Sequence, residues 1–379
     1  MATTPNLTLS SILNKRHALR SLLEQTEYHI VDVAIPKTAL SPELEPNIRG
    51  YLTTIAQQIV ANPSFILVDN YELNERKKDW ISLVNKPVVE NGTVLPIDTR
   101  SRPGHKILDH HMPHFYDVKN YKGVSVRSLM IQEAVEKALL ANLCMHSTPY
   151  KSEIRRMMTM TGGLGNVTKY RTVTAKAIVQ AFGAKRVLDP CIGWGGRMLG
   201  ALSSAPDVVY VGCEPDPNTA KGLRNILADP AIPETVRQRG TVLEQPIEVA
   251  LPTLQTMELF DCVLTSPPYF NLELYTAGPQ STETYHTWED WSTKWLQPVI
   301  LGSLACLKPT GASCWSVKNI KADKVYPLAD FVKKVHTDAG WRLTKTVTMR
   351  GSGRPGGKRI EDGKETRESE EETFCFTRV

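Results

Sequence analysis

The chain has 379 residues, of which 41% are hydrophobic and 22% are charged, and its formal net charge is +5. This composition is typical of a soluble globular protein with a main domain and a smaller one, and no apolar run reaches the roughly 20 residues of a membrane span. Seven scattered cysteines without a CxxC pair argue against a zinc or disulfide framework and favour a reducing, cytoplasmic compartment.

The first part of the chain, residues 1–165, is predicted to be a mixed, mainly helical region. No acidic residue precedes Glu24, so the start could be a transit peptide, although residues 10–25 also read as an ordinary capped helix. Helical runs are predicted at 44–62 and 125–145, and between them the segment 86–121 is loop-rich, with many prolines, glycines and histidines.

A third helix is predicted at 151–160, and it leads into the glycine-rich segment "TGGLGNVTKYR" at 161–171. A further helix is expected at 174–182.

From Arg186 onward, short β-rich runs alternate with helices. Strands are predicted at 186–189, 208–214, 240–244, 260–265, 312–317, 342–349 and 373–379. Strands that alternate with crossover helices form a mostly parallel sheet covered on both faces. The last two strands follow each other directly, which predicts a closing antiparallel hairpin with 351–371 as its tip. The predicted fold is therefore α/β, with a Rossmann-like seven-stranded sheet in a domain at 166–379.

The first strand ends at Asp189 and opens into "DPCIGWGG", a loop with Gly193, Gly195 and Gly196 before the next helix. Glycines let the backbone come close to a bound ligand. The spacing is not the dinucleotide fingerprint, because its last glycine position is Met198. An ordinary tight strand-to-helix turn is the alternative interpretation.

The second and third strands end in polar residues. Glu214 lies about 20 residues after the glycines, where a carboxylate can accept both hydroxyls of a ribose. Gln245 follows the third strand, where the adenine of a nucleoside would lie.

The fourth strand runs into "TSPPYF", residues 265–270. Pro267 and Pro268 end the strand, because proline donates no ladder hydrogen bond and fixes its own φ. The stiff turn holds Ser266 and Tyr269 at the carboxyl end of the strand, which is the edge where open parallel sheets bind ligands.

Together, "DPCIGWGG", Glu214 and "TSPPYF" resemble the corresponding motifs of the S-adenosylmethionine-dependent DNA amino-methyltransferases. The sequence of these motifs is also similar to that of methylases from phages and mobile elements. The resemblance covers about 165–379. It implies S-adenosylmethionine as cofactor, DNA as partner, no metal, and the cytoplasm of a bacterial or phage-infected host cell as location. The implied cofactor-binding residues are Asp189, Pro190, Gly193, Gly195, Gly196, Glu214, Asp216, Gln245 and Thr265. The implied catalytic residues are Ser266, Pro267, Pro268 and Tyr269.

An exocyclic amine of cytosine or adenine is a poor nucleophile and is buried in the duplex, so the base must be extruded. The Ser266 hydroxyl and the Pro267 carbonyl can accept the two amine protons, and Tyr269 offers a face on which the base can stack. Cytosine-C5 methylation would need a nucleophilic cysteine in a Pro-Cys loop. The only such pair, Pro190-Cys191, lies in the cofactor loop, which argues against that chemistry.

The prediction of which base is methylated depends on the residue at one position of the motif, Ser266. In the resembling families, Ser at the Ser266 position usually accompanies cytosine-N4, whereas Asp or Asn accompanies adenine-N6. Cytosine-N4 is therefore favoured slightly, and adenine-N6 stays open.

Basic residues cluster in two places, which suggests a polyanionic partner, although solvated faces are an equally good interpretation. The first cluster comprises Lys151, Arg155, Arg156, Lys169, Arg171, Lys176, Lys185, Arg186 and Arg197. The second spans 342–359 and includes "GSGRPGGKR", a candidate minor-groove hook or basic hairpin tip. The predicted nucleic-acid-binding residues are Phe270, Arg155, Arg156, Arg171, Arg354 and Lys358.

The histidines of "DHHMPHFYD", residues 109–117, match no standard zinc spacing, so a loop or nucleic-acid contact is preferred to a metal site. Only residues 1–165 have room for a domain that reads the DNA sequence. Two rival functions stay open: an RNA amino-methyltransferase acting on guanine-N2 or adenine-N6, and a non-catalytic nucleic-acid-binding protein with a methyltransferase fold. The oligomeric state, the recognised sequence and the biological role do not follow from the sequence.

Overall fold

The computed structural model describes residues 46–98, 101–120, 122–144, 150–164, 168–270, 273–274, 280–321, 325–352, 359–361, 364–366 and 368–378. The chain forms two compact units. The helical unit is Met1–Asp69 with Pro113–Val167, and the sheet unit is Asn70–Met112 with Thr168–Val379.

The helical unit confirms the predicted helices at 44–62 and 151–160. The helix predicted at 125–145 is an α-helix only over Gln132–Cys144, and a separate 3-10 turn precedes it. Its described elements are α3 (Pro46–Ala61), α4 (Ser64–Leu67), η1 (Pro113–Asp117), β4 (Lys119–Asn120), η2 (Arg127–Leu129), α7 (Gln132–Cys144) and α8 (Lys151–Thr161). Apolar residues at helical spacing, such as Ile55 and Ile59, meet Leu139 and Met157 in a core of its own.

The sheet unit confirms the α/β prediction. The strands are β3 (Ile97–Asp98), β5 (Arg186–Asp189), β6 (Val209–Cys213), β7 (Gly240–Leu243), β8 (Phe260–Thr265), β10 (Leu307–Ser316), β13 (Trp341–Ser352) and β16 (Glu368–Arg378). Their spatial order is β3-β13-β16-β10-β8-β5-β6-β7.

The five strands β10, β8, β5, β6 and β7 are parallel to one another, and β16 is antiparallel to both β10 and β13. This is the Rossmann-like seven-stranded sheet with a reversed last hairpin that the sequence predicts. Two features differ from the prediction. β3 adds an eighth strand beside β13, and the hairpin ladder continues to Ser352 paired with Glu368, so the tip is shorter than 351–371.

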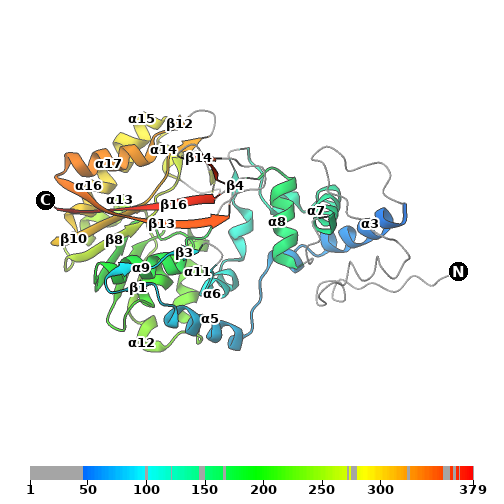
Figure 1. Ribbon diagram of the computed structural model, residues 1–379, viewed down its shortest axis with the longest axis horizontal. Helices are drawn as coiled ribbons and strands as arrows, with labels where there is room; N and C mark the ends of the chain where they lie inside the picture. The colour runs from blue at the N-terminus through cyan, green and yellow to red at the C-terminus, as the bar shows by residue number, and fades with distance from the viewer. Residues whose placement is uncertain are drawn as a thin grey trace. The chain divides into compact units, whose positions relative to one another are not determined.

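Helices cover both faces of this sheet (Figure 1). One face carries α13 (Ile247–Leu254), η4 (Trp291–Leu296), α16 (Gln297–Ala305) and α17 (Leu328–Asp338), and the other carries α9 (Thr172–Ala181), α10 (Gly196–Leu202) and α11 (Pro217–Ala228). The remaining described elements are α5 (Leu73–Asn85), β1 (Val89–Glu90), β2 (Thr93–Val94), α6 (His105–His111), α12 (Glu234–Arg237), β9 (Glu273–Leu274), α14 (Ser281–Thr284), α15 (Trp288–Asp290), β11 (Ile320–Lys321), β12 (Val325–Tyr326), β14 (Arg359–Glu361) and β15 (Lys364–Thr366).

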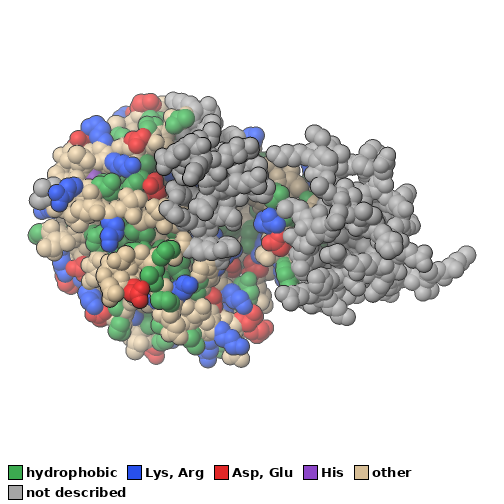
Figure 2. All heavy atoms as spheres, viewed as in Figure 1, with side chains coloured by type: hydrophobic (Ala, Val, Ile, Leu, Met, Phe, Trp, Pro, Cys, Tyr) green, Lys and Arg blue, Asp and Glu red, His purple; other side chains and the backbone are tan. Residues whose placement is uncertain are grey.

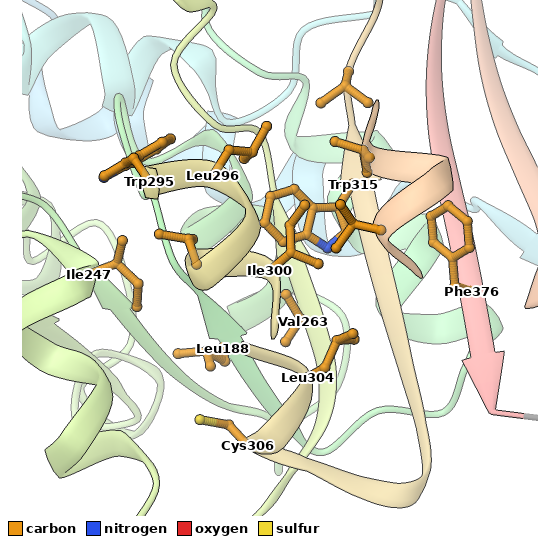
Figure 3. Close-up of a cluster of buried hydrophobic side chains, with 14 of the residues drawn as sticks. Leu188, Ile247, Val263, Trp295, Leu296, Ile300, Leu304, Cys306, Trp315 and Phe376 are labelled. Atoms are coloured by element: carbon orange, nitrogen blue, oxygen red, sulfur yellow. The ribbon is translucent and has the colours of Figure 1, made fainter. Parts of the chain in front are cut away.

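The core on the first face is built by alternate strand residues. Leu188, Val263 and Trp315 point from β5, β8 and β10 toward Ile300 and Leu304 of α16 (Figure 3). Each is buried, and burying a large apolar side chain contributes about 1.5–3 kcal/mol. This packing fixes the register of the strands whose ends carry the candidate site.

The segment 70–112 belongs to the sheet unit, whereas the sequence placed it in the N-terminal region. Buried ionic contacts tie it there. Arg76 Nε lies 2.8 Å and His111 Nε2 lies 2.7 Å from Asp229 Oδ2, at the end of α11. Lys176 of α9 donates to the carbonyls of Leu83, Val84 and Lys86 at 2.9, 2.5 and 2.8 Å, which caps the carboxyl end of α5.

Candidate active site at the carboxyl edge of the sheet

Three loops meet at one edge because β5, β6 and β8 are parallel neighbours. They are the glycine loop at 190–196, the acidic turn at 214–216 and the proline turn at 266–270. Ligands of open α/β sheets bind at this edge.

The glycine loop takes a conformation that other residues would strain. Gly193 and Gly195 have φ of +58° and +81°, in the left-handed region that favours glycine. A Cβ on Gly195 would lie 2.9 Å from Leu223, and one on Gly196 would collide with the carbonyl oxygen of Tyr170. A Cβ on Gly193 would meet nothing within 4 Å among the described residues, so this glycine borders open space.

Glu214, directly after β6, joins the second loop to the first. Its Oε2 accepts a hydrogen bond from Gly193 N at 3.0 Å, and its Oε1 accepts one from Asp216 N, also at 3.0 Å. Each oxygen keeps a lone pair for a further donor. Burial raises the pKa of this carboxyl to about 7, against the opposing effect of the two amide donors.

Asp189, at the end of β5, is fully buried, and both oxygens of its carboxylate accept hydrogen bonds from protein groups. Its carboxylate accepts hydrogen bonds from Thr265 Oγ1 at 2.8 Å, Tyr210 Oη at 2.6 Å and Arg197 Nε at 2.7 Å. Its oxygens are thus taken up by side chains of the protein itself. The placement of Asp189 beside the cofactor stays a prediction. Arg197 is a member of the site that the sequence pattern did not predict, because a cation in a glycine-rich segment is usually a surface residue.

The proline turn is anchored by Phe270. This residue is 4% exposed and has φ of +36°, in the left-handed region, which costs a non-glycine residue roughly 1 kcal/mol or more. Its ring packs against Trp288, Trp291 and Tyr326 at centroid distances of 5.9, 5.5 and 5.2 Å. The predicted nucleic-acid contact by Phe270 is thus corrected, since the ring is enclosed in the aromatic core.

The residues before Phe270 are more accessible. Ser266, Pro268 and Tyr269 are half-buried, whereas Pro267 is buried. The ammonium of Lys318, just beyond β10, lies 5.8 Å from the centre of the Tyr269 ring. The turn therefore holds a hydroxyl and an aromatic ring beside the glycine loop.

The remaining predicted cofactor residues lie at the same edge. Asp216 is the N-cap of α11, where its Oδ2 accepts from Thr219 N at 2.8 Å. Pro190 is buried at the start of the glycine loop, Thr265 is the last residue of β8, and Gln245 follows β7 on the outer side of the sheet.

The predicted nucleic-acid-binding residues that the structure describes belong to both units. Arg155 is 8% exposed, pairs with Asp69 at 2.9 Å and stacks on Tyr116, so its predicted phosphate contact is corrected. Arg156 is exposed and pairs with Glu153 at 2.7 Å, and Arg171 is half-buried beside α9. Arg354 and Lys358 lie outside the described residues.

The first basic cluster is weaker evidence for a polyanionic partner than the sequence suggests, because many of its cations are buried. Four of its nine residues, Arg155, Lys169, Lys176 and Arg197, are buried. On the face shown in Figure 2, the described Lys and Arg side chains are interspersed with Asp and Glu. The excess of basic residues in this segment is therefore explained by contacts inside the protein as well as by a polyanionic partner.

In the part of the chain that the structure describes, no group of His, Cys, Asp and Glu residues is arranged to hold a metal ion. His111 of the histidine-rich stretch pairs with Asp229, and His110 Nδ1 accepts from Tyr71 N at 3.2 Å. No helix within the described ranges is both long and apolar enough to cross a membrane.

No family model and no curated protein matches the chain. Among solved structures it is similar to TrmN from Thermus thermophilus, with 17% identity, a TM-score of 0.35 and coverage of 55% of this chain and 49% of that one. The chain thus spans about half the length of TrmN.

Two further structures have similar scores. Precorrin-6y C5,15-methyltransferase from Geobacter metallireducens GS-15 is 13% identical, with a TM-score of 0.36 and coverage of 56% of this chain and 90% of that one. The O-methyltransferase from Bacillus cereus in complex with SAH is 11% identical, with a TM-score of 0.34 and coverage of 65% and 91%. At these scores, the assignment of the fold depends on the order and direction of the strands.

Proposed function

We propose that the protein is an S-adenosylmethionine-dependent amino-methyltransferase that acts on the exocyclic amine of an extruded base in DNA. One observation carries the proposal. The "TSPPY" turn leaves β8 directly beside the glycine loop that leaves β5, and the hydrogen bond of 2.8 Å between Thr265 Oγ1 and Asp189 Oδ1 holds the two strand ends together. A methyl donor in the loop and an amine at the turn would then be neighbours.

The loop and the acidic turn fit a nucleoside cofactor. Glu214 keeps a lone pair on each oxygen, which suits the two hydroxyls of a ribose. Gly193 borders open space where the backbone can approach a ligand. S-adenosylmethionine would supply an electrophilic sulfonium methyl group at this place.

The proline turn suits an amine acceptor. The Ser266 hydroxyl and the Pro267 carbonyl can accept the two amine protons, so that the nitrogen lone pair turns away from the ring and toward the methyl group. The prolines keep these acceptors in place before the substrate arrives, which is a preorganisation effect. Tyr269 stacks on the base, a contact worth about 1–3 kcal/mol. No strong general base is required.

Cytosine-N4 is the slightly favoured target, because Ser266 stands where related enzymes of the adenine-N6 type carry Asp or Asn. A carboxylate at this position would repel the N3 acceptor beside the cytosine amine. The helical unit, with residues 1–69 and 113–167, is proposed to contribute to DNA recognition.

The test is methyl transfer from labelled S-adenosylmethionine to duplex DNA, single-stranded DNA and RNA, followed by digestion to nucleosides and mass identification. We expect N4-methylcytosine in DNA. N6-methyladenine would reverse the preferred base, and a product only in RNA would replace the acceptor. A folded, cofactor-binding protein that methylates none of these acceptors would contradict the proposal.

Two variants sharpen this test. Ser266→Ala should slow transfer by about 10²–10³-fold, the scale of one lost transition-state hydrogen bond, with affinity for S-adenosylhomocysteine within about twofold of wild type. Ser266→Asp should not restore activity on cytosine. A fully active Ser266→Asp protein that methylates adenine would show that the site serves adenine.

A further inference from the structure

A line of buried polar side chains crosses the sheet beneath the candidate site. Tyr210 of β6, Arg197 of α10 and Thr265 of β8 all donate to the carboxylate of Asp189 in β5. Arg197 also lies over the ring of Tyr170, 5.1 Å from its centre. The Tyr170 hydroxyl in turn contacts Ser316 Oγ of β10 at 3.0 Å and Thr373 Oγ1 of β16 at 3.2 Å.

The Asp189 carboxylate has no capacity left for a ligand. Oδ1 accepts from Thr265 Oγ1 at 2.8 Å, Cys191 N at 3.2 Å and Arg197 Nη2 at 3.4 Å. Oδ2 accepts from Arg197 Nε at 2.7 Å and Tyr210 Oη at 2.6 Å. An ionised carboxylate offers about four lone-pair positions, so these contacts fill it. Its role must therefore be exerted through its partners.

Arg197 extends this contact to the backbone of the glycine loop. Its Nη2 donates to the carbonyl of Ile192 at 3.0 Å and also to that of Cys191. A planar guanidinium presents several donors in a fixed geometry, so it can hold a carboxylate and two carbonyls at once. The position of the loop is thereby tied to the position of Asp189.

Thr265 extends the same contact to the proline turn. It is fully buried, it is the last residue of β8, and its backbone pairs with Trp315 of β10. Ser266 is the next residue along the chain, and the prolines that follow leave its backbone little freedom. A shift of the Thr265 side chain is therefore passed on to the Ser266 hydroxyl.

We propose that Arg197, Asp189 and Thr265 form a positioning triad that fixes the glycine loop and the proline turn relative to each other, so that the donor methyl and the acceptor amine meet at reacting distance. This inference rests on the proposed function and deepens it. All three side chains are buried, and Arg197 and Thr265 both donate to Asp189. Removal of the triad should slow the transfer step without weakening cofactor binding to the same extent.

Thr265→Val is the sharpest variant, because it removes one hydroxyl and keeps the shape of the buried side chain. Calorimetry would measure the affinity for S-adenosylhomocysteine, and single-turnover kinetics with saturating cofactor would measure methyl transfer. We expect affinity within about twofold of wild type and a transfer rate about 10–100-fold lower, the effect of a small misplacement of reacting groups. An unchanged rate, or a rate and an affinity reduced by the same factor, would overturn the proposal.

Matched variants separate positioning from a general loss of packing. Thr265→Ser restores the hydroxyl and should recover the rate to within about threefold of wild type; a rate as low as that of Thr265→Val would overturn the proposal. Thr174→Val removes another fully buried threonine hydroxyl, one that contacts Met349 Sδ at 2.6 Å in the same unit. It should change neither quantity.

A double-mutant cycle tests whether Arg197 acts through the same contact. Arg197→Lys keeps the charge but cannot span the carboxylate and the two carbonyls. In this background, Thr265→Val should slow transfer by less than about threefold, because the contact is already disturbed. Full multiplication of the two losses would overturn the triad.

Failure of the triad can be told apart from failure of the proposed function. A folded wild-type protein that transfers no methyl group to any nucleic acid refutes the function. The triad would then be tested by crystal structures of wild type and Thr265→Val. A displaced Ser266 with an unmoved glycine loop supports positioning, and identical positions of Ser266 overturn it.

Discussion

The glycine loop at 190–196 and the proline turn at 266–270 leave neighbouring strands of one sheet, yet they are held in different ways. The glycine loop has a conformationally permissive backbone, and two side chains outside the loop hold it in place. Arg197 donates to its carbonyls, and Glu214 accepts from one of its amides. The proline turn is stiff by its own chemistry and is anchored by the buried ring of Phe270. A glycine-rich loop that lets a ligand approach its backbone must be held in place by side chains from elsewhere in the chain. A turn with two prolines is already rigid, because the proline rings fix its backbone dihedral angles.

The strongest test of this comparison breaks the charge that supports the glycine loop. Arg197→Leu leaves the buried carboxyl of Asp189 without its cation, and removing one partner of a buried pair typically costs about 3–5 kcal/mol. We expect this loss in the free energy of unfolding measured with urea. Lys334→Ala, which breaks the exposed pair with Asp338 on α17, should cause little change. Similar small losses for both variants would contradict the structural role of the pair.

The second test removes the anchor of the proline turn. Phe270→Ala should lower the free energy of unfolding by about 3 kcal/mol, because it empties a site enclosed by Trp288, Trp291 and Tyr326. The adjacent Tyr269→Ala removes a half-buried ring and should cost much less stability. Its main effect should be lost retention of the base, seen as lower fluorescence of 2-aminopurine placed at the target. Equal losses of stability would mean that Tyr269 also serves mainly as packing.

Two glycines of the same loop should respond differently to one added methyl group. Gly196→Ala forces a Cβ against the backbone of Tyr170, and overpacking of this kind costs about 1–3 kcal/mol of stability. Gly193→Ala has room for the Cβ and pays about 1 kcal/mol for its φ of +58°. Its larger effect should be weaker binding of S-adenosylhomocysteine, measured by calorimetry. Unchanged affinity would mean that the ligand does not approach Gly193.

The smallest effect concerns pH. Burial raises the pKa of Glu214 from 4.5 to about 7, so the folded protein keeps a proton that the unfolded chain releases, and this group lowers stability as pH rises through that window. Ribose hydroxyls donate to the ionised form. Affinity for S-adenosylhomocysteine should therefore fall by up to about tenfold for each pH unit below 7. Glu214→Gln should bind more weakly at pH 8 and lose this pH dependence. A flat wild-type profile would place the ribose elsewhere.

Short-range patterns of the sequence predicted much of this fold. Alternating strands and helices, the direct succession of the last two strands and the prolines after β8 are local signals, and all of them agree with the structure. β3 was missed because a strand of two residues shows no periodicity, and α6 was missed because it lies in a segment rich in prolines and histidines.

The buried cations could not be predicted in the same way. Arg155 forms an ion pair with Asp69, which lies 86 residues before it in the sequence. Lys176 caps the end of α5 through the carbonyl of Lys86, which lies 90 residues before it. In the sequence these residues read as one basic surface cluster. Only the tertiary structure shows which cations are enclosed, and Arg197 is the case that matters most for the site.

The central claim is that the glycine loop and the proline turn form one site for a methyl donor and an amine acceptor. A crystal structure of the full chain with S-adenosylhomocysteine tests it most directly. We expect both ribose hydroxyls within hydrogen-bond distance of Glu214, the methionine part along the loop at Gly193, and the sulfur facing Ser266. A ligand bound away from Glu214, or a sulfur turned away from the proline turn, would contradict the account.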